Sequence, residues 1–170
     1  PVVDVDFCAR HDTHTGIQRV VRETLPLWAR DHAPVPVAHT DRPTAYRQLT
    51  ARERHRVLDF DGAWAAPATE DAPALVVPWR TVVVMPDVLN PESVDSLAAL
   101  AQYSGNEVAL VGYDMIPLVS TELRPVEEAT VFAHYLRLVK HADRVAAISS
   151  SAAVEFAGFA SMLPDRKSVV

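Results

Sequence analysis

Glycine and cysteine are scarce in this chain of 170 residues, which has five glycines and a single cysteine, Cys8. No Gly-x-Gly-x-x-Gly pattern follows the first apolar segment, so the sequence does not indicate the phosphate-binding loop of a dinucleotide-binding protein. A single cysteine cannot form an internal disulfide, which is typical of a reducing compartment. We therefore expect neither a bound dinucleotide nor a disulfide within this chain.

Long apolar runs and an excess of positive charge are also missing. No stretch approaches the roughly eighteen apolar residues of a membrane span, and the first residues show no signal-peptide pattern. The net charge is −6, with 16 basic and 22 acidic residues. This balance argues against a nucleic-acid-binding protein, which needs clustered Lys and Arg. These absences favour a cytoplasmic protein with no nucleic-acid partner.

One segment, residues 42–56, departs from the acidic balance. Glu53 is its only acid, against Arg42, Arg47, Arg52, Arg54, His55 and Arg56. Such a run is typical of a solvated helix face. Alternatively, it makes peripheral contact with the inner face of a membrane, because basic side chains near anionic lipid each add roughly 1 kcal/mol of attraction.

The pattern of apolar residues predicts a single α/β domain, and the apolar fraction of 49% is enough to fill its core. Strands are predicted at 2–7, 35–39, 81–85, 108–113 and 144–148, and helices at 16–32, 93–103, 126–142 and 150–159. Pro67, Pro73 and Pro78 predict an irregular segment over 61–78. Alternating strands and helices predict a Rossmann-like parallel sheet with helices on both faces.

Polar residues follow the ends of several predicted strands. Asp87 comes after one strand, Tyr113 and Asp114 end the next, and Ser149 follows the last. The first long helix opens at Thr15-Gly16. In an open parallel sheet, the carboxyl ends of strands and the amino ends of helices line the ligand crevice. The sequence therefore predicts a crevice for a hydroxyl-rich or phosphorylated ligand.

Three segments carry a resemblance to a known family. Residues 15–22 read Thr-Gly-Ile-Gln-Arg-Val-Val-Arg, residues 112–118 read Gly-Tyr-Asp-Met-Ile-Pro-Leu, and residues 142–149 read Ala-Asp-Arg-Val-Ala-Ala-Ile-Ser. In order and spacing, nearly the whole chain resembles the N-terminal half of bacterial glycosyltransferases of sequence family four. The first segment is the most specific of the three.

The resemblance implies a retaining glycosyltransferase of the GT-B architecture, which has two Rossmann-like domains. The N-terminal domain receives a saccharide or lipid-linked acceptor, and the C-terminal domain holds the nucleotide-sugar donor. That donor domain is absent from residues 1–170, which open on a strand at Pro1 and stop where another strand could begin, at 168–170. We therefore expect a fragment that is inactive alone. The resemblance implies no metal or other cofactor, and a role in surface polysaccharide synthesis.

Residue by residue, the resemblance places Gly16 at a turn that approaches the donor phosphate or the reacting sugar. Thr15 and Arg19 flank this turn. Arg19 either pairs with phosphate through two hydrogen bonds or pairs with a neighbouring carboxylate. Thr15, Gly16 and Arg19 are therefore candidate substrate-binding residues.

The remaining candidates follow the later strands. Asp114 is the candidate catalytic residue, which would orient an acceptor hydroxyl or accept its proton; capping of the following loop is the alternative. Tyr113 stands where family members often carry His, and Ser149 matches the serine that ends a later strand. Both are candidate substrate-binding residues, although helix capping would also explain the serine.

Two other functions fit parts of the sequence. Asp4-Val5-Asp6 and Asp59-Phe60-Asp61 resemble the Asp-x-Asp motif of haloacid-dehalogenase-type phosphatases, although the family's later Lys and acidic pair are missing. Alternate residues of a strand share a face, so Asp4 and Asp6 are predicted to make a poor metal site. The second alternative is a non-catalytic sugar- or partner-binding module of the same fold.

Overall fold

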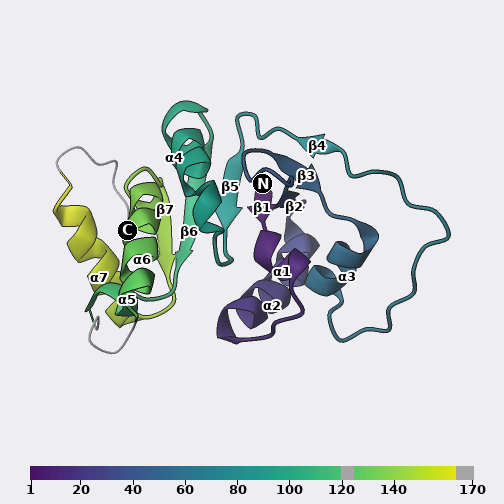
Figure 1. Ribbon diagram of the computed structural model, residues 1–170, viewed down its shortest axis with the longest axis horizontal. Coiled ribbons are helices and arrows are strands. Elements are labelled where there is room, and N and C mark those ends of the chain that lie inside the picture. Colours follow the sequence, from purple (N-terminus) through teal and green to yellow (C-terminus); the bar gives the residue numbers. More distant parts are fainter. Residues whose placement is uncertain (120–124, 164–170) are drawn as a thin grey trace.

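The chain has a Rossmann-like α/β fold, seen in a computed structural model that describes residues 1–119 and 125–163. Within these residues, seven strands form one sheet in the order β4-β3-β2-β1-β5-β6-β7 (Figure 1). The strands are β1 (Val2–Asp4), β2 (Val35–His39), β3 (Tyr46–Gln48), β4 (Leu75–Val76), β5 (Val82–Met85), β6 (Glu107–Gly112) and β7 (Arg144–Ala147).

The sheet is mixed, with a parallel centre. Strands β2, β1, β5, β6 and β7 run parallel, whereas β3 is antiparallel to β2 and β4 is antiparallel to β3. From β1 the chain passes to β2 on one side, and later to β5 on the other side. This change of direction places a topological switch point at the carboxyl ends of β1 and β5, where sheets of this kind bind ligands.

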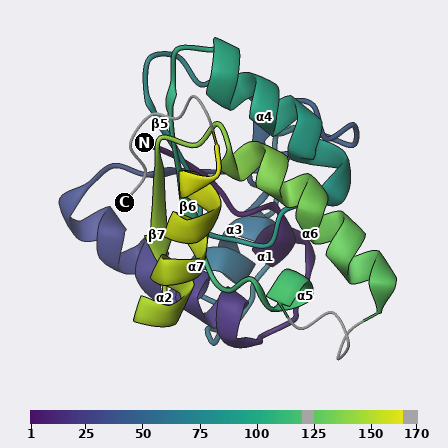
Figure 2. The same ribbon diagram turned by 90° about the vertical axis from the view of Figure 1, so that its left-hand side faces the viewer.

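Helices cover both faces of the sheet, as predicted. They are α1 (Asp6–Arg10), α2 (Gly16–Asp31), α3 (Ala51–Leu58), α4 (Val94–Tyr103), α5 (Ile116–Val119), α6 (Val126–Val139) and α7 (Ser150–Ser161), with a 3₁₀ turn, η1, at Pro91–Ser93. Figure 2 shows α4 and α6 running beside each other, and these helices are in contact. In Figure 1, α1, α2 and α3 group around β1 and β2.

The alternation of side chains along β1 separates two cores. Val2 lies in register with Val83, which lies in register with Val108, and all three are buried with residues of α4 and α6 in what we call the α4–α6 core. Val3 points to the opposite face, where it packs with Val21 and Val57 in what we call the α1–α3 core. One strand therefore contributes to both cores.

The strand predicted at 2–7 is wrong beyond Asp4. The backbone leaves the extended conformation at Val5 (φ −130°, ψ 29°), and helix α1 begins at Asp6. The Asp4 carboxylate accepts a hydrogen bond from the Asp6 amide, which supports this turn. The sequence predicts a strand, a loop and a helix, whereas the structure has a strand, the short helix α1, a loop and then helix α2.

The segment predicted to be irregular, 61–78, contains strand β4 at Leu75–Val76, which pairs with β3. The preceding basic segment is partly helical, as expected, and Thr50 and Glu53 form the capping box of α3. The other predicted strands and helices are confirmed, with ends that differ by up to three residues. The strand expected to begin at 168–170 lies outside the described residues.

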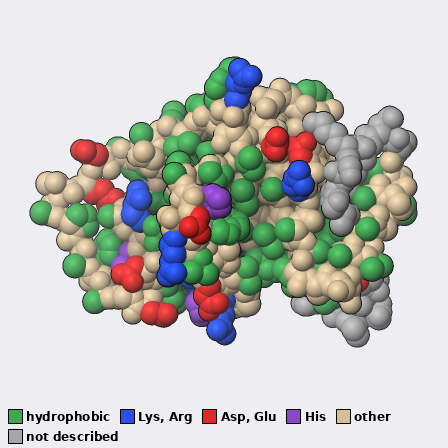
Figure 3. Space-filling model, turned by 180° about the vertical axis from the view of Figure 1, so that it is seen from behind, with side chains coloured by type: hydrophobic (Ala, Val, Ile, Leu, Met, Phe, Trp, Pro, Cys, Tyr) green, Lys and Arg blue, Asp and Glu red, His purple; other side chains and the backbone are tan. Residues whose placement is uncertain are grey.

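Acidic side chains lie next to basic side chains of the 42–56 segment. Arg47 pairs with Glu53 (2.6 Å), and Arg56 pairs with Asp12 (2.6 Å). Figure 3 shows the same mixture of basic, acidic and apolar side chains on the face that it presents. No helix among the described residues is long and apolar enough to cross a membrane. Peripheral membrane contact through the 42–56 segment stays a prediction.

Candidate functional site

A cavity of about 450 Å³ lies at the carboxyl ends of β5 and β6, and we call it the β5–β6 pocket. Two of the predicted site residues, Tyr113 and Asp114, line it. Ile17, from the first turn of α2, also lines it, so the pocket lies beside the Thr15-Gly16 turn. The structure thus brings together the starts of two of the segments that carry the family resemblance.

The β5–β6 pocket combines acidic groups with apolar walls. Carboxylates come from Asp87, Asp114, Glu127 and Glu128, and none of the described lining residues is Lys or Arg. The apolar lining includes Val111, Val131, Phe132, Tyr135 and Phe156. Carboxylates accept hydrogen bonds from hydroxyl groups and repel phosphate, so the lining favours an uncharged polyol over an anion.

Asp87 lies at the switch point between β1 and β5, two residues after the end of β5. The residue is 7% exposed, and its carboxylate accepts hydrogen bonds from the backbone amides of Cys8 (2.7 Å) and Val88 (2.8 Å). Burial raises the pKa of Asp87 and outweighs the opposing effect of these bonds. Burial, reinforced by the Asp87 charge, also raises the pKa of the Cys8 thiol. Cys8 is therefore unsuited to act as a nucleophile.

Tyr113 and Asp114 each bond to nearby backbone. The Tyr113 hydroxyl donates to the Pro86 carbonyl (2.6 Å), and burial raises the pKa of this phenol. Asp114 accepts a hydrogen bond from the Ile116 amide (3.1 Å) at the start of α5. Asp114 therefore caps the start of α5, which is the alternative role given for it from the sequence. Because that bond uses one carboxylate oxygen, Oδ1, capping and ligand binding by Oδ2 are compatible.

The start of α2 is organised by its own side chains. The Gln18 Oε1 atom accepts hydrogen bonds from the Thr15 amide (3.2 Å) and the Thr15 hydroxyl. Thr15 is thus the N-cap of the helix. A Cβ atom built on Gly16 would meet nothing within 4 Å. The backbone of this turn is therefore open to close approach.

Arg19 and Ser149 do not line the β5–β6 pocket. The Arg19 guanidinium pairs with Glu23 one turn along α2 (2.7 Å), and both side chains are largely exposed. The Ser149 hydroxyl accepts a hydrogen bond from the Ala152 amide (3.1 Å) and caps α7. In this structure both residues have local partners, and their proposed contacts with substrate stay predictions.

Arg22, the last residue of the 15–22 segment, makes structural contacts that the sequence did not indicate. Its guanidinium is buried and stacks on Phe60, 3.8 Å from the ring centre. It donates hydrogen bonds to the carbonyls of Thr13 (2.6 Å), His11 (2.9 Å) and Arg56 (2.9 Å). One side chain therefore fixes the loop that leads from α1 to the Thr15-Gly16 turn.

The Asp-x-Asp at the end of β1 is engaged by the protein itself. Asp4 accepts hydrogen bonds from His39 (2.9 Å) and from the Tyr46 hydroxyl (3.0 Å). Asp6 accepts hydrogen bonds from Arg10 (2.7 Å) and from the His39 amide (2.8 Å). No cluster of three or more potential metal-ligating side chains occurs in residues 1–119 and 125–163. The buried carboxylates thus give no support to the phosphatase alternative.

Comparisons with protein-family models, with curated proteins and with solved structures found no match to this chain. Its function therefore has to be argued from the pocket and from the motifs that meet there.

Proposed function

We propose that this chain is the acceptor-binding domain of a retaining glycosyltransferase, and that the β5–β6 pocket holds a saccharide or lipid-linked acceptor. One observation carries the proposal: Ile17, Tyr113 and Asp114 line the same cavity although they come from segments almost a hundred residues apart. These segments are the ones that resemble the glycosyltransferase family.

The residues that line the pocket suit the saccharide acceptor better than the nucleotide-sugar donor. Several residues that line the pocket carry carboxylates, and hydroxyl groups of a sugar are good hydrogen-bond donors to carboxylate oxygens. Phe132 and Tyr135 give the apolar faces against which sugar rings or a lipid stem pack. A nucleoside diphosphate would meet like charge in this pocket. We therefore assign the donor to a second domain, outside residues 1–170.

In the proposed reaction, an acceptor hydroxyl attacks the anomeric carbon of the donor sugar on the face from which the diphosphate leaves, and the bond from that carbon to the diphosphate oxygen breaks. Asp114 orients the hydroxyl and takes its proton. The positive end of the α2 dipole, beside the open Gly16, stabilises the negative charge on the leaving diphosphate. The anomeric configuration is retained. The nucleotide sugar is a substrate, and the reaction as proposed uses no metal.

Acceptor-dependent release of nucleoside diphosphate tests this proposal. The full-length gene product would be assayed with a panel of nucleotide sugars and with lipid-linked and free saccharide acceptors. Loss of a group that accepts the proton lowers turnover by about a hundred-fold or more, so we expect Asp114→Asn to do so. Asp71→Asn is the matched control, because Asp71 is exposed and lies outside the pocket.

Two results would contradict the proposal. One is no release with any donor from a protein whose circular dichroism is that of a folded α/β domain. The other is equal turnover in the Asp114→Asn and Asp71→Asn proteins. A reading frame that ends near Val170, with no donor domain, would leave a non-catalytic binding module.

A further inference from the structure

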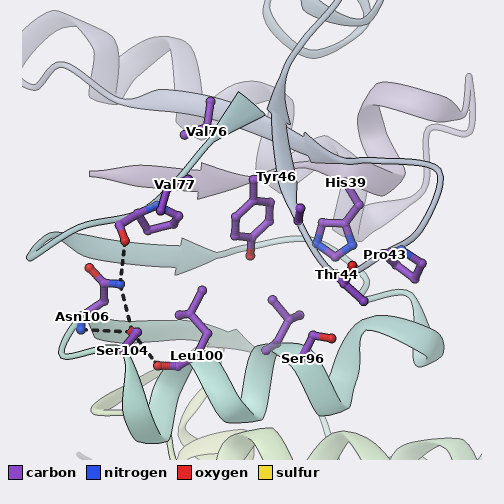
Figure 4. Close-up of a pocket in the computed structure, with 13 residues that line it drawn as sticks. His39, Pro43, Thr44, Tyr46, Val76, Val77, Ser96, Leu100, Ser104 and Asn106 are labelled. Atoms are coloured by element: carbon purple, nitrogen blue, oxygen red, sulfur yellow. Dashed lines mark hydrogen bonds between the residues drawn. The ribbon is translucent and has the colours of Figure 1, made fainter. Parts of the chain in front are cut away.

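A second cavity lies on the other side of α4, between that helix and the β3–β4 edge of the sheet, and we call it the α4–β3 cavity (Figure 4). Its volume is about 350 Å³, within the range of roughly 300 to 1,000 Å³ typical of small-molecule sites. It shares no lining residue with the β5–β6 pocket. It is therefore a separate site that the proposed transferase reaction does not use.

At one end of the α4–β3 cavity, the polar side chains form hydrogen bonds within the protein. The Asn106 side-chain amide donates to the Pro78 carbonyl (3.2 Å) and to the Ser104 hydroxyl (2.9 Å), and Ser104 donates to the Leu100 carbonyl (2.6 Å). Figure 4 shows this chain of bonds at one end of the cavity. These groups close that end and leave no polar atom there in need of a ligand.

The middle of the cavity is apolar and the opposite end is polar. Val76 and Val77 lie across from Leu100 of α4 (Figure 4), and Leu97 also lines the cavity. Beyond them, His39, Thr44 and Ser96 gather at the end remote from Asn106 (Figure 4). The hydroxyls of Thr44 and Ser96 make no hydrogen bond with the described residues. The cavity is therefore amphiphilic along its length.

His39 supplies the strongest sign of a missing partner. Its side chain is buried, with 3% of the residue exposed, and Nε2 bonds to Asp4. Nδ1 is the only buried side-chain polar atom among the described residues that has no hydrogen-bond partner. Leaving such an atom unpaired costs about 1–3 kcal/mol. Asp4 fixes the ring, so Nδ1 is held in place for a partner that the protein does not provide.

We propose that the α4–β3 cavity binds a small uncharged molecule with a flat apolar body and one hydroxyl group, which bonds to His39 Nδ1 when the side chains that now cover this buried atom move aside. No Asp, Glu, Lys or Arg is among the described residues that line the cavity, so an ionic ligand would lack a counter-charge there. The apolar body lies between α4 and β4, and Thr44 and Ser96 surround the hydroxyl end. A phenol or a similar alcohol has this chemistry.

A hydroxyl also suits either protonation state of the imidazole. Burial disfavours the charged ring, but the hydrogen bond and charge of Asp4 outweigh it and raise the pKa of His39 above its ordinary value of 6.5. Neutral His39 donates from Nε2 to Asp4 and accepts at Nδ1, whereas the charged ring donates from both nitrogens. A hydroxyl donates in the first case and accepts in the second, which a carbonyl or an ether cannot do.

The direct test uses 2-naphthol as the probe and naphthalene as its partner without a hydroxyl. Binding is followed through the ring nitrogen signals of ¹⁵N-labelled histidines, with His39 assigned by its absence in His39→Gln. We expect 2-naphthol to saturate and to shift the His39 Nδ1 signal. Naphthalene should bind at least about ten-fold more weakly, because it leaves Nδ1 unpaired.

Variants locate the probe within the cavity. Thr44→Val keeps the shape of the side chain and removes its hydroxyl. This variant should weaken the binding of 2-naphthol about five-fold. Leu100→Trp fills the apolar middle and should abolish binding, whereas Leu27→Trp, at an exposed position on α2, should leave it unchanged. Ser151→Ala is the matched control for loss of a hydroxyl on the surface.

The proposal is overturned if 2-naphthol fails to move the His39 signal, or if naphthalene binds as tightly as 2-naphthol. Binding that survives Leu100→Trp in a folded protein also overturns it, because the probe must then sit elsewhere. None of these outcomes bears on nucleoside diphosphate release, so the two proposals stand or fall separately.

Discussion

At the scale of single residues, the buried Arg22 side chain ties together three segments around the proposed site. Its guanidinium donates to backbone carbonyls of the loop between α1 and α2 and to the end of α3. These carbonyls lie outside regular helix or strand pairing, and a charged donor satisfies them more strongly than a neutral one. Arg22 thus holds the Thr15-Gly16 turn indirectly, by fixing the loop that precedes it.

Replacing Arg22 with Met keeps much of the apolar stem and removes every one of these hydrogen bonds. We expect Arg22→Met to lower the free energy of unfolding by about 3 kcal/mol, because several partly buried carbonyls lose a charged donor together. Arg19→Met is the control from the same helix, since its ion pair is exposed and is worth less than about 1 kcal/mol. Urea denaturation of both proteins measures the difference. Equal midpoints would show that solvent replaces the Arg22 contacts.

Sequence reasoning placed Asp87, Tyr113 and Asp114 at the predicted crevice, and all three line the β5–β6 pocket, but it missed the buried side chains of Arg22 and His39. Tyr113 and Asp114 were predictable because they follow a strand, and strand ends meet at one edge of the sheet. Arg22 and His39 were not, because their value comes from partners far along the chain. His39 meets Asp4 across 35 residues, and Arg22 meets the Arg56 carbonyl across 34. No local pattern records such pairs.

At the scale of elements, α1 depends on a cap that is distant in sequence. Val5, at its N-cap position, offers no side-chain hydrogen bond, and the Cys8 amide donates to Asp87 at the end of β5 instead. A five-residue helix without a cap is marginal in water. This explains why α1 was not predictable, whereas α3 and α7 carry their own capping Thr50 and Ser149. Strands β3 and β4 escaped prediction because they have three and two residues.

Removal of the distant cap should therefore loosen α1 in particular. We expect Asp87→Ala to cost about 1–2 kcal/mol and to speed hydrogen exchange at the Cys8 and Ala9 amides, because the Cys8 amide loses its acceptor. Asn90→Ala is the control, since the Asn90 side chain accepts a hydrogen bond from the amide of Glu92, an exposed residue of the turn η1. Amide exchange measured by NMR separates the two variants. Unchanged protection at Cys8 would mean that α1 holds without Asp87.

At the scale of the whole molecule, one sheet joins two cores on opposite faces. Leu25 of α2 is buried in the α1–α3 core, and Leu138 of α6 is buried in the α4–α6 core. Val2 and Val3 are adjacent in β1 and belong to different cores. Loss of either core exposes one face of β1, a central strand that pairs with β2 and β5. The two cores are therefore expected to unfold together, as in most small domains.

Two matched substitutions test this coupling. Leu25→Ala and Leu138→Ala each leave a cavity and should cost about 2–5 kcal/mol, whereas Leu27→Ala, on the exposed side of α2, should change stability by less than about 0.5 kcal/mol. Trp28 packs against the α1–α3 core and reports on it by fluorescence once the exposed Trp64 and Trp79 are replaced by Phe, while far-UV circular dichroism follows the whole chain. In urea, Leu138→Ala should shift both signals to one common lower midpoint although it lies across the sheet from Trp28. A fluorescence midpoint that stays in place while the circular dichroism splits into two steps would show that the faces unfold independently.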